Sequence, residues 1–130
     1  MSYQHAIVWI DSMQATVIDF SVDDRHVAQV EREGGPRRIH TKSGLPGNGK
    51  AADDPKFFEA VAVALGDARE VLLVGPGQAK LTFRKEMERR HPEVAQHIVG
   101  VESLDHPSTA ELLAFARRYF KRDDALHGNR

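Results

Sequence analysis

Two short apolar runs near the N-terminus are joined by so few residues that they can pair only as an antiparallel hairpin. Residues 6–10 and 15–20 are rich in β-branched and aromatic side chains, which favours buried strands. Only residues 11–14 separate them, whereas a parallel crossover needs about a dozen residues or more. A second turn at Asp23-Asp24 leads into an edge-like strand at residues 26–31, so the chain begins as a three-stranded meander.

Beyond residue 52, helical and strand patterns alternate. Asp54 and Pro55 fit the N-cap and the first position of a helix. A buried strand follows at residues 70–74, then a helix at about 78–91 and a last short strand at 98–101. Ser108 and Glu111 stand at capping-box spacing and begin a third helix. The polar tail, residues 121–130, is expected to fray.

Helical periodicity also predicts which side chains face the core. The expected inner residues of the three helices are Phe57, Phe58, Val61, Leu65; Ala79, Phe83, Met87; and Leu112, Phe115, Ala116, Tyr119, Phe120. The expected surface cations of the second helix are Lys80, Arg84, Lys85, Arg89 and Arg90. The helix faces are therefore amphipathic enough to pack on a sheet.

The order β-β-β-α-β-α-β-α predicts a single α/β domain over residues 1–130, with helices packed on a mixed five-stranded sheet. Right-handed crossovers place the first strand at the centre, the hairpin strands on one side, and the fourth and fifth strands on the other. This is the ribonuclease-H-like topology.

Composition excludes several classes of protein. The chain has 130 residues, of which 41% are hydrophobic, and it contains no cysteine. It is therefore not disordered throughout and not stabilised by disulfide bonds, and no thiolate can bind a metal or attack a substrate. No signal-peptide pattern and no apolar run of about 20 residues is present, so we expect a cytoplasmic protein without a membrane partner.

The net charge of −1 is a cancellation between segments. Residues 1–31 carry a net charge of −4, whereas residues 32–52, 78–91 and 117–130 carry +4, +3 and +3. Local positive density of this kind is what contact with RNA phosphate requires. The chain as a whole is not a uniformly basic nucleic-acid binder.

Residues 32–52 form a long basic loop with five glycines and two prolines. Loops longer than about a dozen residues in a compact domain are usually functional or disordered. The residues that we expect to contact RNA or phosphate are Arg37, Arg38, Lys42 and Lys50. The loop has no aromatic residue, so the sequence gives no support for base stacking.

A glycine-rich turn at residues 75–80 joins a buried strand to a helix. Gly75, Gly77, Gln78 and Lys80 are candidates for an anion-binding turn, because a helix start offers free N–H groups and Lys80 adds a charge. The spacing of a P-loop is missing. A plain strand-to-helix turn is the alternative interpretation.

Catalytic and metal-binding patterns are absent from the sequence. Asp11 ends the first strand, where a two-metal nuclease needs a carboxylate, but the fourth strand ends without an acid. Asp11 is better explained as a turn residue. None of the seven histidines forms a pair at i, i+4, and neither Ser12 nor Ser103 has the sequence of a nucleophile elbow near Asp105-His106. We therefore expect no catalytic residue, no metal and no cofactor.

Three segments carry a resemblance to a known family. The segments Val8-Trp9-Ile10-Asp11, GPGQAK at 75–80 with the strand before it, and Val99-Gly100-Val101-Glu102 resemble the middle domain of Pelota and of eukaryotic and archaeal class-1 release factors. Over about residues 5–120 the chain is similar to small stand-alone bacterial proteins described as translational machinery proteins. The resemblance implies the ribonuclease-H-like fold and a relationship to ribosome-associated domains.

The chain departs from the release factors in the long loop. Release factors carry Gly-Gly-Gln there, whereas here Pro36 follows Gly34-Gly35. Without the glutamine, the resemblance does not imply peptide release. We expect a non-enzymatic domain that contacts the ribosome or RNA. The alternatives are a homo-oligomer that associates through the edge strand at residues 26–31, and an enzyme for a small anionic ligand at the sheet end near Asp11, Gly75–Lys80 and His106.

Overall fold

One mixed five-stranded sheet organises the chain. The computed structural model describes residues 4–32 and 55–126, with side chains through residue 122. The strands, in the order β3-β2-β1-β4-β5 across the sheet, are β3 (Arg25–Glu31), β2 (Gln14–Phe20), β1 (His5–Ile10), β4 (Glu70–Gly75) and β5 (Ile98–Ser103). The predicted topology, with the first strand at the centre, is confirmed.

The register follows from the short connections and the crossovers. The β1/β2 and β2/β3 pairs are antiparallel, with Ile7 opposite Ile18 and Val17 opposite Ala28. The β1/β4 and β4/β5 pairs are parallel, and the β4/β5 register shifts at a bulge between Val71 and Leu72. Asp11 shapes the β1–β2 turn, because its Oδ1 accepts hydrogen bonds of 2.9 Å from the backbone N–H groups of Met13 and Gln14.

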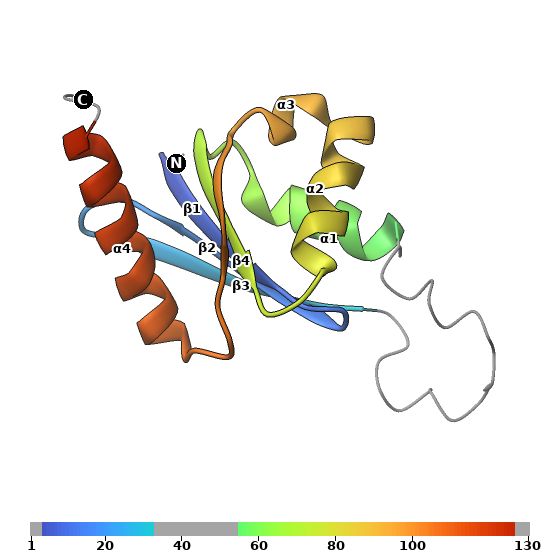
Figure 1. Cartoon of the computed structure of the whole chain (residues 1–130), viewed down its shortest axis with the longest axis horizontal. Helices are drawn as coiled ribbons and strands as arrows, with labels where there is room; N and C mark the ends of the chain where they lie inside the picture. Colours follow the sequence, from blue (N-terminus) through green and yellow to red (C-terminus); the bar gives the residue numbers. More distant parts are fainter. Residues whose placement is uncertain (1–3, 33–54, 127–130) are drawn as a thin grey trace.

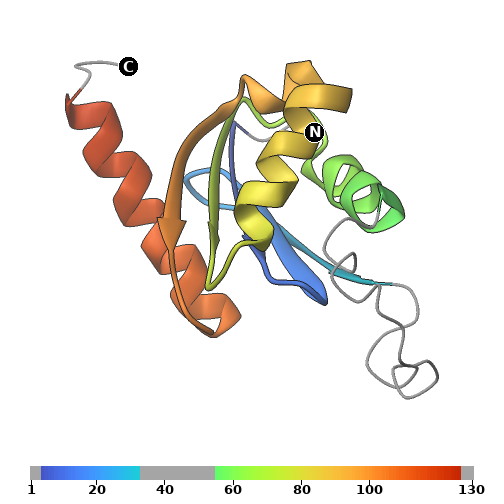
Figure 2. The same cartoon turned by 45° about the vertical axis from the view of Figure 1, so that its right-hand side comes forward.

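Helices cover both faces of the sheet (Figures 1 and 2). The helices on one face are α1 (Pro55–Leu65), α2 (Ala79–Arg90) and the short α3 (Pro92–Ala95), and α4 (Thr109–Leu126) lies on the other face. The predicted inner residues Phe57, Phe58, Val61, Leu65, Ala79, Phe83 and Met87 are buried on the first face, and Leu112, Ala116 and Phe120 on the second. Phe115 and Tyr119, which are also on α4, are half-buried and pack against the core on this second face.

Helix α4 begins as its sequence predicts and continues into the polar tail. Ser108 and Glu111 form the reciprocal capping box, with N–H to side-chain oxygen distances of 2.9 and 3.1 Å. The helix continues to Leu126, and fraying of the tail, residues 121–130, stays a prediction. Residues 121–126 contain no glycine or proline that would stop a helix.

Two glycines allow elements to approach closely. A Cβ on Gly75 would collide with the backbone carbonyl of Ile10 in the neighbouring strand β1. A Cβ on Gly100 would meet the hydroxyl of Tyr119 on α4. Glycine at these positions therefore lets β4 lie against β1 and lets α4 pack on β5.

Candidate nucleic-acid interface

Helix α2 presents a basic outer face. Its buried residues Phe83 and Met87 fix the side that packs on the sheet, which leaves Arg84, Lys85 and the C-terminal arginines outside. The exposed cations are Arg84, Lys85, Arg89 and Arg90, and the acids among them are Glu86 and Glu88. Arg84 pairs with Glu88 at 3.8 Å. Cations exceed acids on this face, as the segment charge predicted.

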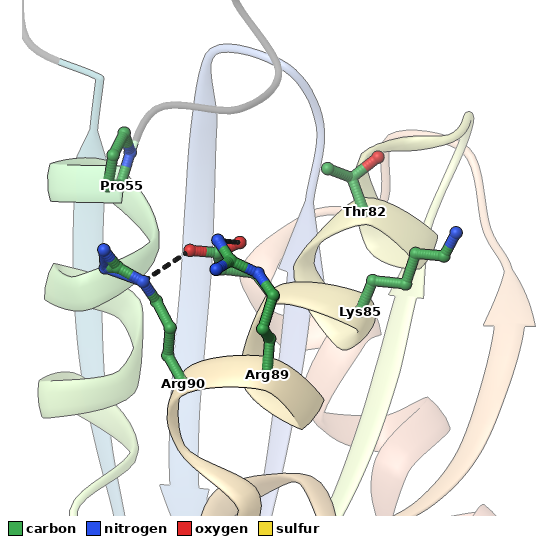
Figure 3. A pocket seen from close by; sticks show the side chains of 6 residues that line it. Pro55, Thr82, Lys85, Arg89 and Arg90 are labelled. Carbon is green, nitrogen blue, oxygen red and sulfur yellow. Dashed lines mark hydrogen bonds and ion pairs between the residues drawn. The ribbon is translucent and has the colours of Figure 1, made fainter.

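A groove of about 490 Å³ lies between the start of α1 and this face of α2. Its lining residues are Pro55, Thr82, Lys85, Glu86, Arg89 and Arg90 (Figure 3). Three cations against one carboxylate make the groove electropositive. Such a lining suits an oxyanion such as phosphate, which guanidinium and ammonium groups bind through charge-assisted hydrogen bonds.

Glu86 holds the two arginines of the groove in place. Its side chain is only 17% exposed, and it pairs with Arg89 Nη2 at 3.0 Å and with Arg90 Nε at 2.9 Å. Each guanidinium still has N–H groups beyond those used for Glu86. The remaining donors of Arg89 and Arg90 are thus pre-oriented for a second acceptor.

Lys85 extends the basic surface away from the arginines. Its side chain is exposed and has no hydrogen-bond or ion-pair partner among the described residues. In Figure 3 its amine lies on the opposite side of Arg89 from Arg90. The cations of the groove are therefore spread across the helix and do not converge on one atom. Thr82, one helical turn before Glu86, donates its hydroxyl hydrogen to the carbonyl oxygen of Gln78 at 3.3 Å.

The four loop residues predicted to contact phosphate lie outside the described residues. Arg37, Arg38, Lys42 and Lys50 belong to the segment 33–54, and the predicted loop is described only at Arg32. Pro55, the first described residue after that segment, lines the basic groove. The segment charge indicated a basic α2, but the groove could not be foreseen, because its two walls are far apart along the chain.

The glycine-rich turn differs from expectation in one residue. Lys80 was expected on the surface, but it is 93% buried, since only 7% of its area is exposed, and its Nζ donates to the carbonyl of Gly77 at 2.6 Å. Gln78, the N-cap residue of α2, makes no side-chain capping hydrogen bond. A Cβ on Gly77 would meet open space. An anion at this turn would thus rely on backbone N–H groups, and anion binding by Gly75, Gly77, Gln78 and Lys80 stays a prediction.

The end of the sheet near Asp11 gathers polar groups of different kinds. His106 Nε2 lies 3.8 Å from Asp11 Oδ2, and the imidazole packs at 5.0 Å from the Trp9 ring. The Trp9 indole N–H donates to the Asp105 carbonyl at 2.6 Å. In the described parts of the chain, no group of three His, Cys, Asp or Glu residues could hold a metal ion. Asp11 acts as the turn residue that the sequence favoured.

Asp19 was not singled out from the sequence, yet it is an unusual acid of this fold. It lies in β2 with 8% of its area exposed, and no group in the described chain hydrogen-bonds its Oδ1. Burial raises its pKa to about 6, the neighbouring His26 lowers it, and Asp67 adds to the rise. A signal existed, because strand alternation places Asp19 on the same face as Ala15 and Val17.

No helix among the described residues is long and apolar enough to cross a membrane. The sequence matches no protein-family model and no curated protein. Solved structures do resemble it, and among these are Pelota proteins and an archaeal translation termination factor.

Pelota from Archaeoglobus fulgidus matches with a TM-score of 0.59 at 16% identity, over 91% of this chain and 32% of that chain. Pelota from Thermoplasma acidophilum gives a TM-score of 0.58 at 16% identity, over 85% and 31%. The archaeal termination factor gives 0.56 at 16% identity, over 95% and 39%. The likeness establishes a shared fold with one part of these longer proteins, and the chain spans about a third of their length. Kinship with stand-alone bacterial proteins stays a prediction.

Proposed function

We propose that this chain is a translation-related, non-enzymatic domain that contacts the ribosome or RNA through a basic surface. That surface comprises the outer face of α2, with Lys85, Arg89 and Arg90, and the loop residues Arg37, Arg38, Lys42 and Lys50. The observation that carries the proposal is the electropositive groove lined by Pro55, the first described residue after the segment 33–54. A ribosomal partner would place the protein in the cytoplasm.

Two further observations support the proposal. Glu86 pre-orients Arg89 and Arg90, which lowers the entropy that two long side chains would lose on binding phosphate. The fold is shared with Pelota proteins and with an archaeal translation termination factor. The departure from Gly-Gly-Gln at Gly34-Gly35-Pro36 is consistent with binding in place of peptide release.

Ribosome co-sedimentation at several salt concentrations tests the proposal. The helix variant K85Q/R89Q/R90Q removes three charges while keeping most of each side-chain stem. The loop variant R37A/R38A/K42A/K50A removes the four predicted phosphate-binding side chains. Each should bind more weakly, and the negative slope of log affinity against log salt should become shallower by about 0.7 for every phosphate that the variant no longer neutralises.

A matched control sits on the opposite face of the sheet. R118Q/K121Q/R122Q also removes three exposed positive charges, but from α4. If this variant binds as weakly as the helix variant, only overall charge matters and the proposed surface is wrong. If the helix and loop variants co-sediment with ribosomes as strongly as the wild-type chain does, the proposal is wrong.

A further inference from the structure

Strand β3 lies at an edge of the sheet, and among the described residues it pairs with β2 alone. The Arg32 N–H donates to the Met13 carbonyl at 2.9 Å, which fixes the phase of this ladder. Backbone groups alternate in direction along an antiparallel strand, so those of His26, Ala28 and Val30 point to β2. The residues whose N–H and C=O groups point outward are Arg25, Val27, Gln29 and Glu31.

The sequence of β3 is complementary to itself when it is reversed. If two copies of β3 pair antiparallel about Ala28, Arg25 of one copy lies opposite Glu31 of the other, and Val27 lies opposite Gln29. The outward backbone groups then meet outward groups at every position, as ladder hydrogen bonds require. Two Arg–Glu pairs flank the centre, and opposite charges across strands stabilise the pairing.

Neighbouring registers are worse. A shift by one residue sets outward backbone groups against inward ones, so the ladder cannot form. A shift by two residues in one direction removes both Arg–Glu pairs and puts Glu31 opposite Asp23. A shift by two in the other direction puts Val27 opposite Glu31 and sets Arg25 against residue 33, which lies beyond the end of β3. The backbone therefore excludes shifts by one residue, and within β3 itself the Arg–Glu pairs favour the register centred on Ala28.

The other edge of the sheet lacks these properties. Strand β5 is distorted by the bulge in its pairing with β4, and Tyr119 of α4 packs against its Gly100. Strand β3 contains no proline or lysine of the kind that commonly protects an edge. None of its side chains is fully buried, and Val27 is 37% exposed. The exposed apolar side chain of Val27 thus lies on the self-complementary strand.

We propose that the chain forms a homodimer in which two β3 strands pair antiparallel about Ala28, so that one sheet runs through both copies. The two-fold axis of such a pair is perpendicular to the sheet, which keeps equivalent faces on the same side. The basic α2 surfaces of both copies then face one way, and the two α4 helices face the other. The dimer does not depend on RNA binding.

Sedimentation equilibrium of the nuclease-treated full chain, over a concentration series, tests the dimer. Arg25→Glu and Glu31→Arg each place like charges opposite one another twice per interface. Each single variant should raise the dimer dissociation constant by at least about tenfold. The double variant R25E/E31R restores opposite charges, so its dissociation constant should return to within about threefold of wild type. Glu102→Arg on the exposed surface of β5 is the matched control and should leave the dimer intact.

A backbone variant tests the strand edge itself. Gln29→Pro removes an outward N–H and spares the ladder with β2, since proline is tolerated at the free side of an edge strand. It should yield a monomer whose circular dichroism matches that of the wild type. A wild-type chain that stays monomeric at its highest soluble concentration overturns the proposal. So does a dimer that survives Gln29→Pro, or a double variant whose affinity stays as weak as that of the single variants.

Discussion

Asp19 brings a carboxyl group into the apolar face of the sheet that α1 covers. The residue is 8% exposed, its Oδ1 has no partner in the described chain, and burial is the main reason that its pKa rises to about 6. His26, opposite it in β3, favours the charged form, and Asp67 opposes it. The fold therefore prefers a protonated Asp19, and its ionisation at neutral pH costs stability.

The sign of this effect is testable with Asp19→Asn. Between pH about 4 and 6 the folded chain holds a proton that the unfolded chain releases, so the free energy of unfolding falls as pH rises. The fall amounts to about 2–3 kcal/mol by neutral pH, at about 1.4 kcal/mol per pKa unit. In urea unfolding, the free energy of unfolding of the Asn variant should rise by about 2 kcal/mol relative to that of wild type as the pH increases across this window. A stability difference that stays constant with pH would contradict the assignment.

At the scale of elements, the contact between β4 and β1 depends on one glycine. Gly75→Ala forces a Cβ onto the Ile10 carbonyl, which is backbone and cannot rotate away. We expect it to lower the free energy of unfolding by about 1–3 kcal/mol, as overpacked sites do. Gly77→Ala, two residues later, adds a methyl group to open space and should change stability by less than about 0.5 kcal/mol. Urea midpoints compare the two variants, and equal effects would show that the close approach is not the cause.

Elements set by local chemistry were predictable from the sequence. The β1–β2 hairpin follows from its short link, and the start of α4 follows from the capping pair Ser108 and Glu111. The ribonuclease-H-like order followed because crossovers have one hand. These features depend on residues close together in sequence or on general rules of topology.

Features that depend on tertiary contacts were not predictable. Lys80 was expected outside, but the first turn of α2 faces the sheet, so the lysine bends back to the Gly77 carbonyl. The groove needs the start of α1 beside the last turn of α2, which periodicity cannot place.

At the scale of the whole molecule, two hydrophobic cores share one sheet. Ala6, Val8 and Ile10 of β1 face the α1 and α2 side, while Ile7 and Trp9 face α4. Each core therefore depends on the same central strand. Loss of either core exposes one side of β1, so we expect the two faces to unfold together.

Trp9 makes this coupling measurable, because it is the only tryptophan in the chain and lies in the α4 core. Val61→Ala opens a cavity in the opposite core, where Val61 is fully buried, and should cost about 2 kcal/mol. Val63→Ala, on the same helix but 73% exposed, should cost less than about 0.5 kcal/mol. In urea, Val61→Ala should shift the Trp9 fluorescence midpoint and the far-ultraviolet circular dichroism midpoint equally. If the Trp9 transition stays in place while circular dichroism shifts, the faces unfold separately and the shared strand does not couple them.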